Sequence, residues 1–131
     1  MNQGSGGRTI DDTRPLFLQI AERIEDSIVD GSLPEDAQAP STNELAAFYR
    51  LNPATAAKGV NLLVDKGILA KQRGIGMFVA PGARRALLAE RRAAFAASYV
   101  EPLVVEAEKL GLDETALTAL LREHFAGRKQ R

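Results

Sequence analysis

The sequence contains no cysteine and one histidine, His124, among its 131 residues. Without cysteine there can be neither a disulfide framework nor a thiolate metal site, and one histidine cannot form a histidine cluster. We therefore expect no cofactor and no requirement for a metal. An enzyme would need a nucleophile–base pair or a metal set, and the sequence offers no convincing example of either. These absences argue against an enzyme.

Long apolar runs are also missing. No run approaches the ~18 residues that a membrane span needs. The first residues, MNQGSGGRTIDDTR, lack the apolar segment of a signal peptide. We therefore expect a soluble, cytoplasmic protein with no membrane partner. An apolar fraction of 45% can support a core, and 131 residues indicate one domain, or one small domain with an appendage.

The net charge is zero, but the charges are segregated along the chain. Residues 11–40 carry 2 basic and 8 acidic side chains, net −6, whereas residues 41–92 carry 9 basic and 3 acidic, net +6. Residues 101–125 carry 2 basic and 6 acidic, net −4. Because surface fields act over roughly 8–10 Å, the local balance matters more than the sum. The basic middle segment favours a polyanionic partner.

Two helices are predicted in the first part of the chain. The first has apolar residues at every fourth position, on one face of a helix: Leu16, Ile20, Ile24 and Ile28. Gly31 suits its end. The second begins at Ser41, where Glu44 three residues later would complete a capping box. The loop between them contains two prolines, and we expect only a short extended stretch there, at 37–39.

A third helix and a hairpin follow. Asn52 is a favoured N-cap, and Pro53 is tolerated at the first helical position. The buried positions of this helix are predicted to be Ala56, Gly59, Val60 and Leu63. A glycine inside a helix costs roughly 1 kcal/mol relative to alanine, which we interpret as close approach of the preceding helix. Strands are predicted at 68–72 and 77–80, because the Gly-rich RGIG between two apolar runs is typical of a hairpin.

The last part of the chain is predicted to be helical from residue 83 to about 110. Pro102 lacks an N–H and would deprive the Ser98 carbonyl of its hydrogen bond, so a kink or break is expected near 98–102. Asp113 is the candidate N-cap of a final helix. We therefore divide the chain into a disordered segment 1–13, a domain of three helices and a hairpin at 14–81, a helical region 82–126, whose role as a dimerisation region is argued below, and a basic tail 127–131.

Three helices followed by a two-stranded hairpin form a winged helix-turn-helix, whose third helix enters the major groove of DNA. The predicted fold class is therefore mainly α with a small β-hairpin, followed by a two-helix dimerisation tail. Small residues at the start of the third helix would let its backbone approach the groove. The residues expected at the DNA lie at two helix starts and the hairpin tip: Ser41, Thr42, Asn43, Asn52, Pro53, Ala54, Thr55, Ala57, Lys58, Arg73 and Gly74.

Each part of this set has its own chemistry. The helix start at Ser41 presents N–H groups to a phosphate. Asn52 and Thr55 can bond phosphate or bases, and Lys58 supplies charge. Alone, a capped helix start is nonspecific, and Gly74-x-Gly76 lacks the third glycine and following helix of a dinucleotide site. The order of the elements together favours DNA binding.

The same stretch resembles a known family. The motifs are PLFLQI from residue 15, GSLP from 31, PSTNELA from 40, GIL from 67 and RGIGMFV from 73. They are similar to the DNA-binding domain of the GntR family of bacterial transcription regulators, and the short tail resembles its YtrA-type subfamily. The resemblance implies a dimerising tail of two helices, and it places seven residues at the DNA surface: Ser41, Asn43, Asn52, Thr55, Lys58, Arg73 and Gly74.

This chain departs from the family pattern at three positions. The family commonly has arginine where this chain has Asn43. Many members have polar or basic residues at the positions of Ala54 and Ala57. The departures remove two or three common contacts, so binding would depend more on the wing and on phosphate contacts.

These observations predict a dimeric, sequence-specific DNA-binding repressor that recognises an inverted-repeat operator on double-stranded DNA. The alternative is a winged-helix module for protein interactions, which would not need the basic segment. The tail predicts a homodimer because its two helices carry apolar faces with no third partner in the chain: Leu87, Leu88, Phe95, Tyr99, Leu103, Val104, Leu117, Leu120, Leu121 and Phe125. Residues 83–131 are too few for a separate ligand domain, which leaves the dimer interface as the place for a small-molecule effector.

Overall fold

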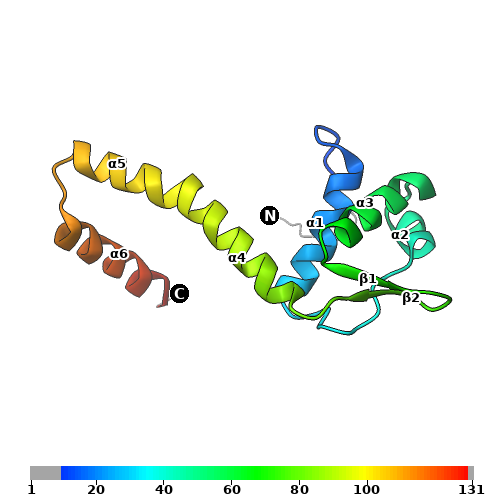
Figure 1. Cartoon of the computed structure of the whole chain (residues 1–131). Helices are drawn as coiled ribbons and strands as arrows, with labels where there is room; N and C mark the ends of the chain where they lie inside the picture. The colour runs from blue at the N-terminus through cyan, green and yellow to red at the C-terminus, as the bar shows by residue number, and fades with distance from the viewer. Residues whose placement is uncertain (1–9, 130–131) are drawn as a thin grey trace. The chain divides into compact units, whose positions relative to one another are not determined.

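The computed structural model describes residues 10–129, and the chain divides into two compact units, the first ending at Ala89 and the second beginning at Glu90. A three-helix domain with a hairpin forms most of the first unit (Figure 1). Its elements are α1 (Leu16–Val29), α2 (Thr42–Tyr49), α3 (Pro53–Asp65), β1 (Leu69–Gln72), β2 (Gly76–Val79) and the start of α4 (Ala83–Phe95). The prediction of a mainly helical chain with one small antiparallel hairpin is confirmed.

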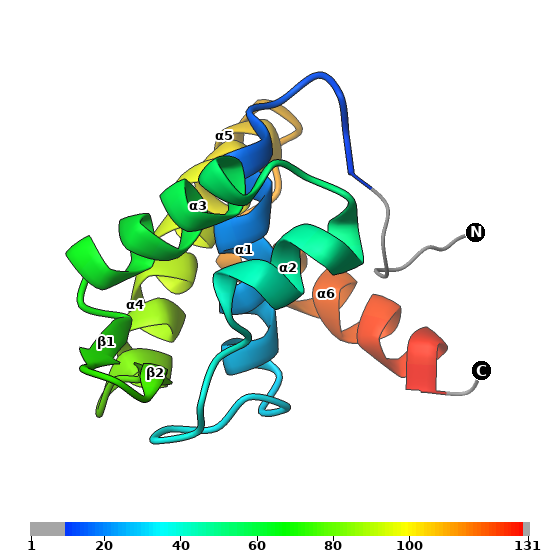
Figure 2. The same cartoon turned by 90° about the vertical axis from the view of Figure 1, so that its right-hand side faces the viewer.

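The core of the first unit is built on the periodic apolar face of α1. Ile20, Ile24 and Ile28 are all buried, as their spacing of four predicts. The helix α3 packs against both α1 and α2 (Figure 2). Its buried residues are the four that the sequence indicates: Ala56, Gly59, Val60 and Leu63. Burial of these side chains fixes which face of α3 remains exposed.

The close approach at Gly59 involves a different helix from the one expected. A Cβ at Gly59 would lie 2.7 Å from the Phe17 carbonyl oxygen and 3.1 Å from the Ile20 Cβ, both in α1. The expectation that the preceding helix, α2, explains this glycine is therefore wrong. The local sequence pattern indicated that another helix approaches α3 closely, but only the tertiary structure shows that this helix is α1.

The hairpin has an additional edge partner from the α1–α2 loop. Leu69 of β1 lies opposite Val79 of β2, and the strands run antiparallel. On the other edge of β2, the Val79 N–H donates to the Ala37 carbonyl at 2.9 Å, and the Ala39 N–H donates to the Met77 carbonyl at 2.8 Å. The short extended stretch predicted at 37–39 is confirmed, and it joins the base of the wing to the helical core.

The first turns of α4 belong to the core of the first unit. Ala83 is 2% and Leu87 1% exposed, and the Arg84 Nε donates to the Val29 carbonyl at 3.0 Å. Leu87 was expected on the dimerisation face, and this assignment is wrong because the side chain is already covered within its own chain. Leu88 beside it is half-buried. Periodicity marks an apolar face, but it does not say which neighbour covers it.

The second unit contains helices separated by a π-helical segment and a turn. Where a kink or break is expected near 98–102, the structure has the π-helical turn η1 (Ala96–Val100), which precedes α5 (Glu101–Lys109) with Pro102 in its first turn. Asp113 caps α6 (Glu114–Lys129), since its Oδ1 accepts from the Ala116 N–H at 2.9 Å. The helix α6 includes residues 127–129, which were expected in a separate basic tail.

Residues 10–15, which the structure describes, lead into α1. The predicted disordered segment 1–13 lies outside the described residues up to position 9, and for 10–13 the prediction is wrong. Ile10 packs against the core, and the Asp11 N–H donates to the Oε1 of buried Gln19 at 2.7 Å. The Gln19 amide also donates to the Arg14 carbonyl at 2.9 Å. One buried polar side chain thus holds this segment, which a composition rich in glycine and aspartate does not reveal.

Candidate nucleic-acid interface

The start of α2 presents free backbone donors at an exposed helix end. The capping box is present: the Glu44 N–H donates to the Ser41 Oγ at 3.0 Å, and the Ser41 N–H donates to the Glu44 Oε1 at 2.8 Å. The N–H groups of Thr42 and Asn43 come before the first intrahelical bond and have no acceptor within the helix. They can therefore bind a phosphate oxygen. The capping carboxylate of Glu44 partly offsets the attraction of the helix end for an anion.

The start of α3 is exposed and free of large side chains. The Asn52 Oδ1 accepts from the Ala54 N–H at 2.8 Å, and Pro53 occupies the first turn, as the sequence predicts. Asn52, Pro53 and Ala54 are exposed, whereas Thr55 and Ala57 are half-buried. The Asn52 oxygen accepts one hydrogen bond in the cap, and the two donors of its amide nitrogen remain available for DNA.

Lys58 has a partner that the sequence analysis missed. Its Nζ lies 4.1 Å from the centroid of the Phe17 ring at the start of α1. At an exposed position such a cation–π contact contributes about 0.5–1 kcal/mol. The contact orients the ammonium group of an exposed side chain on α3. Phe17 lies 41 positions before Lys58, and residues so far apart in sequence give no local signal of this pairing.

The wing tip carries an exposed arginine on a turn held by a glutamine. Arg73 and Gly74 are exposed, Gly74 has φ +77°, and the Ile75 N–H closes the turn on the Gln72 carbonyl at 3.0 Å. The Gln38 Nε2 donates to the Ile75 carbonyl at 3.0 Å. The wing is thereby tied to the α1–α2 loop, which restricts where Arg73 can reach.

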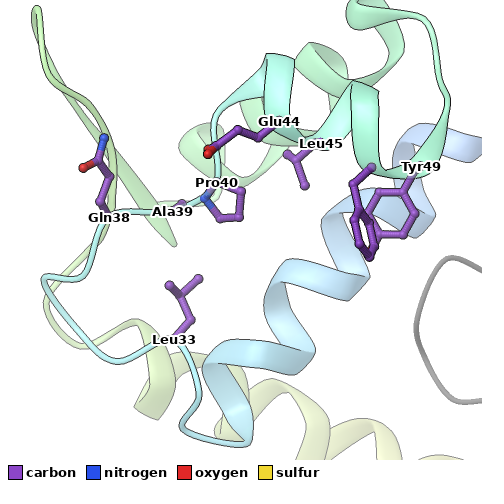
Figure 3. A pocket seen from close by; sticks show the side chains of 8 residues that line it. Leu33, Gln38, Ala39, Pro40, Glu44, Leu45 and Tyr49 are labelled. Carbon is purple, nitrogen blue, oxygen red and sulfur yellow. The ribbon is translucent and has the colours of Figure 1, made fainter.

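A separate hollow of about 680 Å³ lies between the α1–α2 loop and α2 (Figure 3). Its lining includes Leu33, Pro40, Leu45 and the edge-to-face pair Phe48 and Tyr49, whose ring centroids are 4.9 Å apart. None of the residues predicted to contact DNA lines it. This hollow is not predictable from the sequence, because no local pattern indicates that Leu33 and Gln38 of the loop lie near Leu45 and Tyr49 of α2.

Neither a metal site nor a membrane span is found within residues 10–129, which the structure describes. It contains no group of three or more histidine, cysteine, aspartate or glutamate side chains that could hold a metal ion. Within the same residues, no helix is long and apolar enough to cross a membrane. The exposed starts of α2 and α3 and the wing tip therefore form the candidate site.

Comparison with known proteins identifies relatives of this chain. Residues 16–79 match the family model described as bacterial regulatory proteins, gntR family. The chain is 25% identical to the HTH-type transcriptional repressor YtrA of Bacillus subtilis over 109 residues, which is 83% of each protein. It is 37% identical over 76 residues to the uncharacterized HTH-type transcriptional regulator YurK of the same organism, spanning 57% of this chain but only 31% of YurK.

Solved structures show the same architecture. A putative GntR-family regulator from Bacteroides thetaiotaomicron is 29% identical, with a TM-score of 0.70 over 88% of this chain and 98% of that one. YtrA from Sulfolobus acidocaldarius, a GntR-family transcription factor, is 30% identical, with a TM-score of 0.55 over 71% and 100%. The DNA-binding domain of AraR in complex with operator ORX1 is 30% identical, with a TM-score of 0.50 over 61% and 93%.

A helix-turn-helix completed by an antiparallel hairpin defines this protein as a winged-helix, DNA-binding transcription regulator. The class consists of regulators and not of enzymes. The chain belongs to the GntR family, and its helical tail corresponds to the short YtrA type.

Proposed function

We propose that this protein is a homodimeric repressor that binds an inverted-repeat operator through the starts of α2 and α3 and the wing tip. The observation that carries the proposal is the combination of an exposed, small-residue start of α3 with a second unit whose apolar side chains are left exposed. The first suits entry into a major groove, and the second suits pairing with another copy.

The exposed apolar side chains of the second unit support the homodimer. Nine of the ten residues predicted for dimerisation are exposed or half-buried, the exception being Leu87. Phe95 is 56%, Tyr99 67% and Phe125 67% exposed, although aromatic side chains normally bury much of their area. Burying each such side chain contributes ~1.5–3 kcal/mol, and the same helices of a second copy offer the matching surface.

The relatives support the operator and the repressor role. YtrA of Bacillus subtilis is described as a repressor, and the AraR domain was solved with operator DNA. Two copies related by a two-fold axis would present two α3 helices to successive major grooves, which requires half-sites about one helical turn apart. A small-molecule effector would bind between the tail helices of the two copies. The protein would act in the cytoplasm, where the chromosomal DNA lies.

The double variant Lys58→Ala, Arg73→Ala should bind DNA more weakly and with a flatter dependence on salt. Each lost phosphate contact reduces the slope of log K against log salt by about 0.9, so the double variant should lose about 1.8. Gel-shift titrations at several salt concentrations measure this slope. As a control, Lys109→Ala with Arg122→Ala removes the same charge from the second unit and should leave the slope unchanged. An unaltered slope in the Lys58 and Arg73 variant would mean that neither side chain contacts a phosphate.

The proposed function is tested by selection of duplexes from a random library with the intact protein. We expect enrichment of an inverted repeat, and footprinting should then show two protected half-sites about one helical turn apart. The selected duplex placed over a promoter should reduce transcription in a purified system. Enrichment of a single unrepeated site, or of no site, would contradict the proposal.

A further inference from the structure

The exposed face of α3 is unusually apolar for a surface directed at DNA. Ala54, Ala57, Lys58 and Asn61 follow the spacing i, i+3, i+4, i+7, so they form one stripe along the helix. Beside the stripe lies a hollow of about 470 Å³. Its lining is Phe17, Ala54, Ala57, Lys58, Asn61, Leu62 and Asp65. The part of the stripe nearest the helix start therefore consists of two methyl groups.

Two of the polar groups near these methyl groups already have partners within the chain. The Asn52 oxygen accepts from the Ala54 N–H, and the Lys58 ammonium lies over the Phe17 ring on the α1 side. The two alanines have no side-chain hydrogen-bonding atoms at all. Side-chain hydrogen bonds to base edges are therefore absent at positions 54 and 57 themselves, in contrast to the usual use of arginine, asparagine or glutamine on a recognition helix.

The major groove contains one apolar group that matches this surface. Thymine presents a C5-methyl group, whereas the other major-groove features are hydrogen-bond donors and acceptors. A donor or acceptor pressed against an alanine methyl loses water without gaining a partner, and this penalises other bases. A thymine methyl in the same place loses nothing and buries apolar area.

We infer that Ala54 and Ala57 determine sequence specificity by contacting thymine methyl groups in each half-site, with the Phe17-lined hollow beside them. This inference rests on the proposed operator binding. It assigns a preference for thymine to two positions whose side chains carry no polar group. Any operator of this protein should then have thymines opposite the first turns of α3.

The experiment replaces thymine by deoxyuridine, which differs only in lacking the methyl group. The probe is the duplex selected from the random library, with each thymine exchanged singly. For the intact protein, we expect about a fourfold loss of affinity at one or two thymines in each half-site, the effect of one buried methyl. For the variant Ala54→Gly, Ala57→Gly, the thymine and deoxyuridine duplexes should bind equally at those positions.

A control variant tests whether loss of a methyl group elsewhere in the first unit has the same effect. Ala86→Gly makes the same chemical change at an exposed position of α4 and should keep the full fourfold discrimination. The inference is overturned if the intact protein binds every deoxyuridine duplex as tightly as the thymine duplex. This result does not depend on the folding of any variant. It is also overturned if the double glycine variant still discriminates fourfold. If no duplex is enriched, the proposed operator binding itself fails, and this inference with it.

Discussion

The full-length variant Leu121→Glu, Phe125→Glu is expected to be a monomer and to lose about 10²–10⁴-fold in operator affinity, the usual gain from linking two binding modules. Both side chains lie on α6 and are 41% and 67% exposed in the single chain. In the proposed dimer they would be buried, and a carboxylate in an apolar interface loses its hydration without a partner. Sedimentation at micromolar concentration measures the change from twice the 14.1 kDa chain mass to one chain mass.

A control on the opposite face of α6 separates loss of the interface from added charge. Thr115→Glu with Ala119→Glu adds the same two charges at the same spacing, at exposed positions away from the apolar stripe. This variant should remain a dimer and bind the operator normally. The dimer proposal fails if the intact protein sediments as a monomer, or if the Leu121 and Phe125 variant keeps full affinity.

The structure also limits where the tail could be removed. Leu87 belongs to the core of the first unit, so a cut before residue 83 would damage the winged-helix domain itself. Substitutions on α6 avoid this problem, because they leave the first unit unaltered. They are therefore a cleaner test of the tail than a deletion.

The variant Gly59→Ala is expected to lower the free energy of unfolding by about 1–3 kcal/mol, the usual cost of overpacking a core. Its Cβ would lie 2.7 Å from the Phe17 carbonyl oxygen, and a backbone atom cannot move aside as a flexible side chain can. The higher helix propensity of alanine, roughly 1 kcal/mol, acts in the opposite direction and is outweighed. Since domains unfold with about 5–15 kcal/mol in total, the loss should be clear in urea denaturation.

Gly127 provides the matched control for this substitution. It lies in α6, and a Cβ there would meet nothing within 4 Å. Gly127→Ala should therefore keep or raise stability, by up to about 1 kcal/mol, through helix propensity alone. Equal stability of Gly59→Ala and the parent protein would mean that α1 and α3 can separate without cost, contrary to the packing observed.

The local elements of the DNA-binding unit could be predicted because their signals are contained within a few residues. Ser41 with Glu44 defines one helix start, and Asn52 with Pro53 defines another, since capping uses side chains close in sequence to the bonds they satisfy. The four buried positions of α3 were predictable from the helical spacing of its residues, and Pro102 indicated an irregularity close to η1. Each of these features depends on backbone hydrogen bonds between near neighbours.

Tertiary structure alone decided which distant groups meet. It placed α1 against Gly59, covered Leu87 with the core, set Lys58 over Phe17, and held the residues before α1 through Gln19. In each case several other residues could have been the partner without any change in the local sequence pattern. The sequence by itself thus determined the order of the elements and the exposed starts of α2 and α3. Which partner each residue meets depended on packing in three dimensions. The hydrophobic effect is non-directional, so the sequence around a buried residue does not indicate which surface covers it.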